Sequence, residues 1–322
     1  MSKVILAPME GLADWLLRDL LTRIGGYDGA VSEFVRVSGT TLPVRTFRRI
    51  CPELENGSRT PNGTPVAVQL LGSHPERLAE TAARLAELSP MGIDLNFGCP
   101  APTVNRHGGG AMLLDDPDLM LRIAQAVRRA VPPGIDVTAK MRLGISDTQK
   151  TLACAAALQS GGVASLVVHA RTKTEGYRPP AHWEWIARIR ETVSVPVIAN
   201  GEIWSTADYI HCREVTGCAD VMIGRGAVAD PFLARRIHAL ATGMPIEAER
   251  DAEWHVLMPL LSEFWMRVQQ NVVARHAPGR LKLWLNSLRR TYGQADDLYH
   301  RIRGIKECRD VSAVLSAFAT AG

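Results

Sequence analysis

Residues 65–98, PVAVQLLGSHPERLAETAARLAELSPMGIDLNFG, contain the unit from which the fold is built. Pro65–Gly72 and Gly92–Gly98 are short apolar segments bounded by turn residues, which is typical of strands covered on both faces. The segment between them, Pro75–Leu88, has helical periodicity, with one apolar face made of Leu78, Ala82, Leu85 and Leu88. A helix between two buried strands predicts parallel strands joined by a crossover.

The same alternation continues along most of the chain. The eight predicted strands are Val4–Met9, Ala30–Arg36, Pro65–Gly72, Gly92–Gly98, Asp136–Gly144, Ser165–Thr172, Val195–Ile203 and Asp220–Ala227. Further helical patterns cover Pro117–Val131, Thr151–Gln159, His182–Val193 and Asp230–Leu240. Eight strand–helix units predict an α/β fold, a TIM (β/α)8 barrel.

The pattern changes after Leu240. The residues Thr242–Pro245, TGMP, indicate a boundary, and the chain from Ala252 onward is helical with no strand candidate. We therefore predict a barrel domain at 1–245 and a small all-helical domain at 246–322. Barrels carry their active sites at the C-terminal ends of their strands, so any catalysis is expected in the first domain.

Composition places the chain among soluble globular proteins. It has 322 residues, 46% hydrophobic and 22% charged, enough for a barrel of about 250 residues and a small second domain. No apolar run reaches the ~20 residues of a membrane span, and the N-terminus has no cleavage site of a signal peptide. The six cysteines form no CxxC pair, so neither a disulfide framework nor a metal site is expected, and a cytoplasmic location fits. The net charge of +4 permits an anionic partner.

Polar residues stand at the C-terminal end of every predicted strand, where barrels carry their active sites. The set comprises Pro8, Met9 and Glu10; Glu33 and Arg36; Gln69; Asn96 and Cys99; Lys140 and Arg142; His169 and Arg171; Asn200, Gly201 and Glu202; and Gly224, Arg225 and Gly226. Taken singly, His169 would more often be a hydrogen-bonded core histidine, and Met9 a packing residue. Converging from eight strands, the set predicts one active site at the mouth of the barrel.

Residues 92–114, GIDLNFGCPAPTVNRHGGGAMLL, hold the candidate catalytic residue. Cys99 lies just past a strand, on a loop whose glycines Gly108–Gly110 allow a ligand to approach closely. A free cysteine is more commonly a small buried hydrophobe, so Cys99 alone would not establish catalysis.

The strand ends offer what a flavin requires. ANGEI (199–203) and IGRGA (223–227) could bind its phosphate through loop amides, with Arg225 adding charge. Lys140 could neutralise the N1/O2 edge, Pro8 and Met9 could lie against the ring, and Gln69 could bond the pyrimidine edge. GRGAVA nearly matches the dinucleotide motif GxGxxG, but Ala229 replaces its last glycine and no second βαβ unit follows.

The motifs APM, NFGCP, GGGAMLL, KMRLG, HART, NGE and GRG, in this order across the whole barrel, resemble the tRNA-dihydrouridine synthases, which are FMN enzymes that reduce uridine in tRNA. The resemblance implies a tightly bound FMN contacted by Ala7, Pro8, Met9, Gln69, Lys140, His169, Asn200, Gly201, Glu202, Gly224 and Arg225. It also implies that NADPH reduces the FMN, that a uridine flipped out of the tRNA receives hydride at C6, and that Cys99 protonates C5. Asn96 would hold the uracil edge, while Lys140 and Arg142 would stabilise charge on its carbonyls.

Finer similarity points to the bacterial C-type synthases. SEFVRVS (32–38), RICPELENGSRTPNGTPVAVQLLG (49–72) and RLKLWLNSLRRTY (280–292) carry it. It implies that uridine 16 of the D-loop is the target and that Arg36 helps to orient the tRNA. Many relatives have a lysine two residues after GCP, where this chain has Ala101 and Pro102, so Arg106 or His107 could replace its function.

A basic segment in the helical tail could bind RNA. From Phe264 to Tyr292 there is no acid among six basic residues: Arg267, Arg275, Arg280, Lys282, Arg289 and Arg290. Helical spacing places Leu281, Trp284, Leu285 and Leu288 on one face, and Lys282, Asn286 and Arg289 on another. A solvated face is the commoner reading of charged runs, but a basic face without acids favours tRNA phosphates. Arg45, Arg48 and Arg49 could extend it. We expect tRNA and NADPH as partners and a monomeric protein.

Two other functions are compatible with parts of the sequence. A flavin barrel acting on a small molecule, such as a dihydroorotate dehydrogenase or an enoate reductase, would not need the acid-free tail. A barrel that binds RNA without catalysis would not need Cys99, Lys140 and His169.

Overall fold

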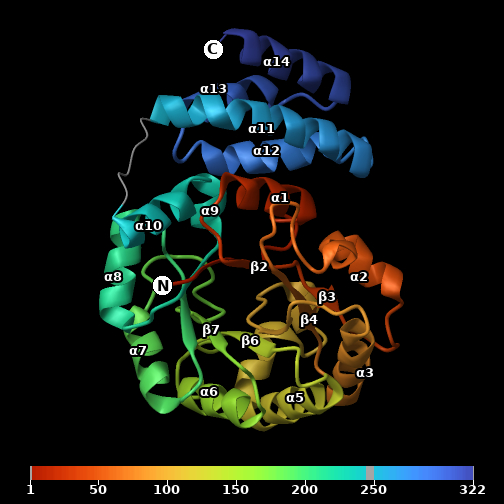
Figure 1. Ribbon diagram of the computed structural model, residues 1–322, viewed down its shortest axis with the longest axis vertical. Coiled ribbons are helices and arrows are strands. Elements are labelled where there is room, and N and C mark those ends of the chain that lie inside the picture. Colours follow the sequence, from red (N-terminus) through yellow and green to blue (C-terminus); the bar gives the residue numbers. More distant parts are fainter. Residues whose placement is uncertain (1, 244–249, 322) are drawn as a thin grey trace.

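A computed structural model describes residues 2–243 and 250–321 (Figure 1). Its centre is a closed barrel of parallel strands, and its order is β2-β1-β9-β8-β7-β6-β5-β4, with β2 pairing β4 to complete the circle. The barrel strands are β1 (Val4–Leu6), β2 (Gly29–Val31), β4 (Val66–Leu71), β5 (Ile93–Phe97), β6 (Val137–Arg142), β7 (Leu166–His169), β8 (Val197–Asn200) and β9 (Val221–Ile223). The predicted TIM barrel is confirmed.

Helices surround the barrel. The main ones are α1 (Trp15–Ile24), α2 (Val44–Ile50), α3 (Pro75–Ala86), α5 (Pro117–Ala130), α6 (Thr151–Ser160), α7 (Trp183–Thr192), α8 (Thr206–Thr216) and α10 (Leu233–Thr242). Shorter turns are η1 (Pro52–Asn56), α4 (Pro102–Asn105), η2 (Gly110–Asp115) and α9 (Arg225–Ala229). On α3, the predicted apolar face is buried through Leu78, Ala82 and Leu85.

The predicted strands are longer than the observed ones, and in two of them the difference has a local cause. The segment 30–36 is two strands, because Ser32 interrupts the ladder: its hydroxyl donates to the Glu33 carbonyl at 2.8 Å and accepts the Gln69 amide at 3.2 Å. The second piece, β3 (Val35–Arg36), pairs with β4. The last barrel strand ends at Ile223 and not at Ala227, because Gly224 leaves the extended conformation (φ −107°, ψ −104°) and Arg225 begins α9.

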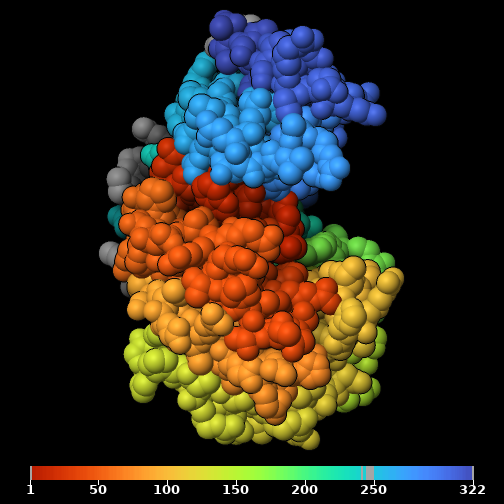
Figure 2. Space-filling view, turned by 90° about the vertical axis from the view of Figure 1, so that its right-hand side faces the viewer, coloured from red at the N-terminus to blue at the C-terminus, as the bar shows by residue number. Residues whose placement is uncertain are grey.

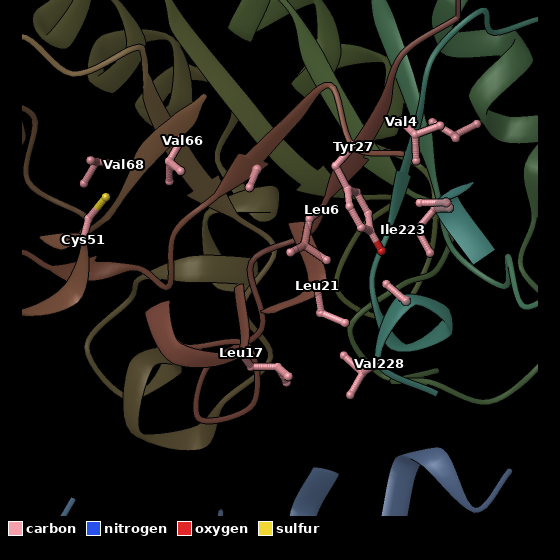
Figure 3. Close-up of a cluster of buried hydrophobic side chains, with 14 of the residues drawn as sticks. Val4, Leu6, Leu17, Leu21, Tyr27, Cys51, Val66, Val68, Ile223 and Val228 are labelled. Carbon is pink, nitrogen blue, oxygen red and sulfur yellow. The ribbon is translucent and has the colours of Figure 1, made fainter. Parts of the chain in front are cut away.

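Alternate strand residues enter two separate apolar clusters. The smaller cluster fills the barrel and contains Ala7, Val31, Val167, Ile198 and Met222. The larger one joins the outer strand faces to the helices; Figure 3 shows Leu6 and Ile223 from the barrel beside Leu17 and Leu21 of α1 and Val228 of α9. These packed layers hold the strand ends at fixed positions around the mouth.

The C-terminal part consists of four helices: α11 (Arg250–Asn271), α12 (Ala277–Leu288), α13 (Gly293–Ile302) and α14 (Cys308–Ala321). They lie above α1 and α9, and Figure 2 shows them seated on the N-terminal part of the barrel. The predicted apolar face of α12 is buried, and Trp284 packs edge-on against Phe264 with ring centroids 4.9 Å apart. α10 ends at Thr242, and the predicted division at 245/246 lies outside the described residues.

No helix among the residues that the structure describes is long and apolar enough to span a membrane.

Candidate active site

A cavity of about 530 Å³ occupies the C-terminal mouth of the barrel. All eight barrel strands or the loops that follow them contribute to its lining. Every residue expected to contact the cofactor lines this cavity, namely Ala7, Pro8, Met9, Gln69, Lys140, His169, Asn200, Gly201, Glu202, Gly224 and Arg225, and so do Cys99, Asn96 and Arg142. The structure therefore brings the site residues predicted at eight strand ends together in one cavity.

A chain of hydrogen bonds runs across the cavity floor. The Asn96 amide donates to Gln69 Oε1 at 2.7 Å, Gln69 Nε2 donates to Asp94 at 2.7 Å, and the Thr138 hydroxyl donates to Asp94 at 2.6 Å. Gln69 is fully buried, and both ends of its amide are engaged in this chain. Its orientation is therefore fixed by the protein, with one N–H left for a ligand.

Lys140 lies in register with Asn96, and its buried position disfavours the charged form of its ammonium. Burial, followed by the nearby charge of Arg142, lowers the pKa of the Lys140 ammonium to about 8, although Asp94 opposes the change. The pKa of Asp94 is itself raised by burial, while its bonds to Gln69 and Thr138 act in the opposite direction. A cation that the protein itself destabilises is suited to an anionic ligand.

The Cys99 loop is held by its own polar groups. Asn96 Oδ1 accepts from the Gly98 amide at 3.0 Å and from the Cys99 amide at 2.9 Å. The Cys99 carbonyl accepts from Ala111 N and Asn105 Nδ2, both at 3.0 Å. Gly110 permits this closure, because it has φ +62° and a Cβ there would lie 2.7 Å from the Cys99 carbonyl. Gly110, the last residue of the glycine run, thus packs against Cys99.

The Cys99 thiol is protonated at neutral pH. Burial is the main cause that raises its pKa above the ordinary value. The half-buried thiol also lines the cavity, so it can meet a bound substrate. This combination fits a proton donor better than a nucleophile, which would need a lowered pKa.

Positive charge concentrates around His169. His169 has its pKa held well below the ordinary value, first by burial and then by the charges of Arg142, Lys140, Arg171 and Arg225. Its imidazole is therefore neutral, and Nε2 lies 3.3 Å from Arg171 Nη1. Arg171 pairs with Glu202, a residue with φ +58°. Among the lining residues, the surplus of cations favours an anionic ligand.

Sequence comparison decides the family. The dihydrouridine synthase (Dus) family matches residues 5–309. The chain belongs to the dihydrouridine synthase family. It is 56% identical over 315 residues to a tRNA-dihydrouridine(16) synthase of Ralstonia nicotianae, covering 98% of this chain and 95% of that one. A tRNA-dihydrouridine(16) synthase of Cupriavidus necator is 57% identical (98% and 97% covered), and one of Neisseria meningitidis serogroup A is 47% identical (98% and 95%).

Solved structures show the same fold at low identity. An old yellow enzyme homologue from Zymomonas mobilis aligns with a TM-score of 0.51 and 13% identity, over 74% of this chain and 89% of that one. A 2-naphthoyl-CoA reductase complex aligns with a TM-score of 0.56 and 10% identity, over 76% and 50%.

As a dihydrouridine synthase, the chain is a flavin-dependent oxidoreductase. The family favours this activity over a flavin barrel acting on a small molecule and over a barrel without catalysis.

Two aromatic residues of this synthase's cavity were not predicted from the sequence. Tyr177 and Trp204 line the cavity, and the Arg225 guanidinium lies over both rings, 4.5 Å and 5.0 Å from their centroids. Both aromatic residues lie in loops, where periodicity gives no signal. Aromatic residues in loops that follow barrel strands would have been the sequence clue.

Arg142 lines the cavity, where it was expected to meet the uracil, and most of its donors are already bonded within the protein. Its Nε donates to the Gly98 carbonyl at 2.9 Å, and Nη1 donates to Thr172 and Gly176 carbonyls at 3.0 and 2.9 Å. The residue is 2% exposed. Most of its donors therefore join the Cys99 loop to the loop after β7.

The predicted basic face of α12 is largely compensated by groups from elsewhere. Arg280 pairs with Asp14 at 2.6 Å, and Arg289 pairs with Asp296 at 2.6 Å. The Lys282 ammonium binds the Ile305 carbonyl. Arg275 is exposed and bonds His276 at 3.0 Å, and Arg36 is exposed with one bond to the Thr103 carbonyl at 3.0 Å. The segment without acids in sequence is thus not free of acids in space.

Proposed function

We propose that this enzyme reduces the uridine at position 16 of the tRNA D-loop to 5,6-dihydrouridine, with FMN as its tightly bound cofactor and NADPH as the electron donor. The relatives that share about half of its residues over almost the full chain are named tRNA-dihydrouridine(16) synthases. The observation that carries the proposal is the cavity, which unites Cys99 with every residue expected at the flavin.

The residues of the cavity fit FMN. Gly201 (φ +120°) has no side chain between the backbone and His169, whose Cδ2 a Cβ would meet at 3.0 Å. Gly224 similarly leaves room beside Ala7 and the Met9 sulfur, both 3.5 Å from the position of a Cβ. The backbone at these glycines, with Arg225, would hold the phosphate, while Pro8 and Met9 would contact the ring. Lys140 would neutralise its N1/O2 edge.

When bound and reduced, FMN supplies the two-electron reducing equivalent that uridine reduction requires. Cys99 then donates its proton to uracil C5, because its thiol is protonated and lines the cavity. Asn96 acts chiefly on Cys99, since its side-chain oxygen is used by the loop amides; one amide hydrogen remains for the uracil. Lys140 adds positive charge where a uracil carbonyl would become negative.

For the tRNA, exposed Arg36 and Arg275 are the best phosphate contacts among the residues predicted for that role. The net charge of +4 favours association with RNA. The substrate would place the enzyme in the cytoplasm, and we propose that it acts as a monomer.

Reconstitution tests the function. The purified protein, FMN and NADPH are incubated with an unmodified tRNA transcript, and dihydrouridine is located by mass spectrometry. A matched transcript with cytidine at position 16 controls for other sites. We expect dihydrouridine at position 16 of the first transcript and no dihydrouridine in the second. Modification of both transcripts at another position would reject the assignment to uridine 16.

A further inference from the structure

The segment Pro8–Asp14, between β1 and α1, forms one wall of the cavity. Pro8, Met9, Glu10 and Leu12 line the cavity directly. The segment turns at Gly11 (φ +71°), whose amide donates to Glu33 Oε1 at 2.5 Å. The amide of Leu12 donates to the Met9 carbonyl at 3.0 Å. The Glu33 carboxylate and the Met9 carbonyl thus satisfy these two amides of the turn.

The carbonyls of the same turn are satisfied by Arg280 of α12. One Arg280 Nη donates to the Gly11 carbonyl, and the other donates to the Leu12 carbonyl at 3.3 Å and pairs with Asp14 at 2.6 Å. No other donor within residues 2–243 and 250–321 makes a hydrogen bond to these two carbonyls. Arg280 is therefore the link between this wall and the helical part.

We propose that Arg280 is a positioning residue for the flavin: its guanidinium fixes the Pro8–Asp14 segment in the conformation that receives the cofactor. The inference rests on the proposed function in one respect, that FMN is the group facing this wall. It replaces the expectation that Arg280 mainly contacts tRNA phosphate.

The setting of Arg280 supports a structural link over an RNA contact. Its side chain is only 15% exposed, and its charge is already compensated by Asp14. To bind a phosphate it would have to leave a carboxylate and two carbonyls without their donor, and the free energy lost there opposes the phosphate contact. The planar guanidinium can bridge three acceptors at once, which a single ammonium cannot do equally well.

Helix α12 can hold Arg280 firmly. Leu281, Trp284 and Leu285, which follow Arg280 on the helix, are fully buried in the helical part. Arg290, two residues beyond the end of α12, lies over the Trp204 ring at 3.8 Å, so the segment that follows the helix contacts the cavity wall after β8. Figures 1 and 2 show this part resting on α1 and α9. A displacement of α12 would therefore move cavity walls on both sides of β9.

The test compares Arg280→Ala and Arg280→Lys with Arg275→Ala, an exposed arginine in the same basic segment. The full-length proteins are stripped of flavin and titrated with FMN by fluorescence, and the absorption spectrum of bound FMN is recorded. Their affinity for tRNA is measured at several salt concentrations, and thermal midpoints show that each variant is folded.

We expect Arg280→Ala to bind FMN about tenfold more weakly and to shift the visible bands of the bound flavin, because the wall loses two hydrogen bonds and an ion pair to α12. Arg280→Lys should recover part of this loss, since an ammonium can still pair with Asp14. Arg275→Ala should leave the flavin measurements unchanged and should weaken tRNA binding. The slope of log tRNA affinity against log salt concentration should be smaller in magnitude by about one.

The opposite pattern would overturn the proposal. If Arg280→Ala keeps wild-type FMN affinity and spectrum but loses tRNA affinity, Arg280 is an RNA contact. If that variant does not fold, Asp14→Asn serves instead, because asparagine can still accept from the Leu17 amide, now at 3.1 Å from Asp14 Oδ1, while the ion pair is lost. Unchanged FMN binding in Asp14→Asn would also contradict the proposal. A wild type that binds FMN but makes no dihydrouridine would reject the proposed function and leave these FMN measurements valid.

Discussion

Cys99 differs from the enzyme's other buried cysteines in what surrounds it. Cys51, Cys154 and Cys212 are buried among apolar groups of the core, whereas Cys99 lines the cavity. The backbone N–H and carbonyl of Cys99 are both held by side chains, those of Asn96 and Asn105. A side chain whose backbone is fixed on both sides can present its thiol in one orientation. This supports its assignment as the proton donor.

Removal of the Cys99 thiol should separate binding from catalysis. Cys99→Ala is expected to bind FMN normally but to form dihydrouridine about 10²–10⁴-fold more slowly, the usual contribution of a positioned acid. Cys99→Ser is the matched control for size, and it should be similarly slow because a hydroxyl is a far weaker acid. Single-turnover reduction of tRNA by pre-reduced enzyme measures the effect, and wild-type turnover in either variant would remove Cys99 from the mechanism.

Lys140 should make FMN binding depend on pH. Its ammonium has a pKa of about 8 in the flavin-free protein, so it is charged below pH 8 and neutral above. Because an anionic ligand favours the charged form, FMN affinity should be highest below pH 8 and should fall as the pH rises through that value. Fluorescence titrations from pH 6.5 to 9.5 measure it. Lys140→Gln should bind FMN more weakly at low pH, and its FMN affinity should no longer depend on pH. If this variant keeps the wild-type pH profile, Lys140 is not the source of the pH dependence.

The site residues at the strand ends or one to three residues beyond them could be predicted from sequence, and those farther along the loops could not. A barrel places the C-terminal ends of all its strands at one mouth. Polar residues at the ends of the predicted strands, such as Lys140, His169 and Gln69, were therefore predicted to lie in one site. Tyr177 and Trp204 lie in loops, whose paths are not encoded by periodicity. The partner of Arg280 was also missed, because Asp14 is near the other end of the chain and only the folded molecule brings them together.

At the scale of elements, the prediction was best where burial alone determines conformation. Pro75–Leu88 was predicted as a helix and is α3, because its apolar face must pack on the sheet. It failed where local chemistry competes with the ladder: Ser32 bonds the backbone and splits a strand, and Gly224 turns the chain into α9. Both exceptions lie at the mouth of the barrel, where the fold departs from regular structure to form the site.

Helix α9 depends on a glycine at its closest contact with the loop after β8. A Cβ on Gly226 would lie 2.1 Å from the Ile203 carbonyl, so Gly226→Ala must displace α9. We expect a loss of about 1–3 kcal/mol in the free energy of unfolding, the cost of overpacking. Gly279→Ala in α12 is the control, since a Cβ there meets nothing within 4 Å, and it should raise stability by ~0.5 kcal/mol. Urea denaturation measures both, and equal stability of the two variants would contradict the packing described for α9.

At the scale of the whole molecule, the barrel and the four C-terminal helices act on the same cavity. The barrel supplies its lining, while Arg280 of α12 and Arg290, just beyond that helix, contact two of its walls. The sequence predicted the helical part and the buried face of α12, because both follow from apolar periodicity. It did not predict that most of the basic residues on α12 are paired, since that depends on which surfaces meet.

The central claim is that this chain modifies uridine 16 of tRNA. The most direct measurement maps dihydrouridine at every D-loop position, by mass spectrometry, in tRNA from a strain that lacks this gene and from the same strain with the gene restored. We predict that dihydrouridine at position 16 is lost in the first and returns in the second, while other positions are unchanged. Loss and return at a different position would retain the family and reject uridine 16. Unchanged dihydrouridine throughout, in a strain without another synthase for these sites, would contradict the account.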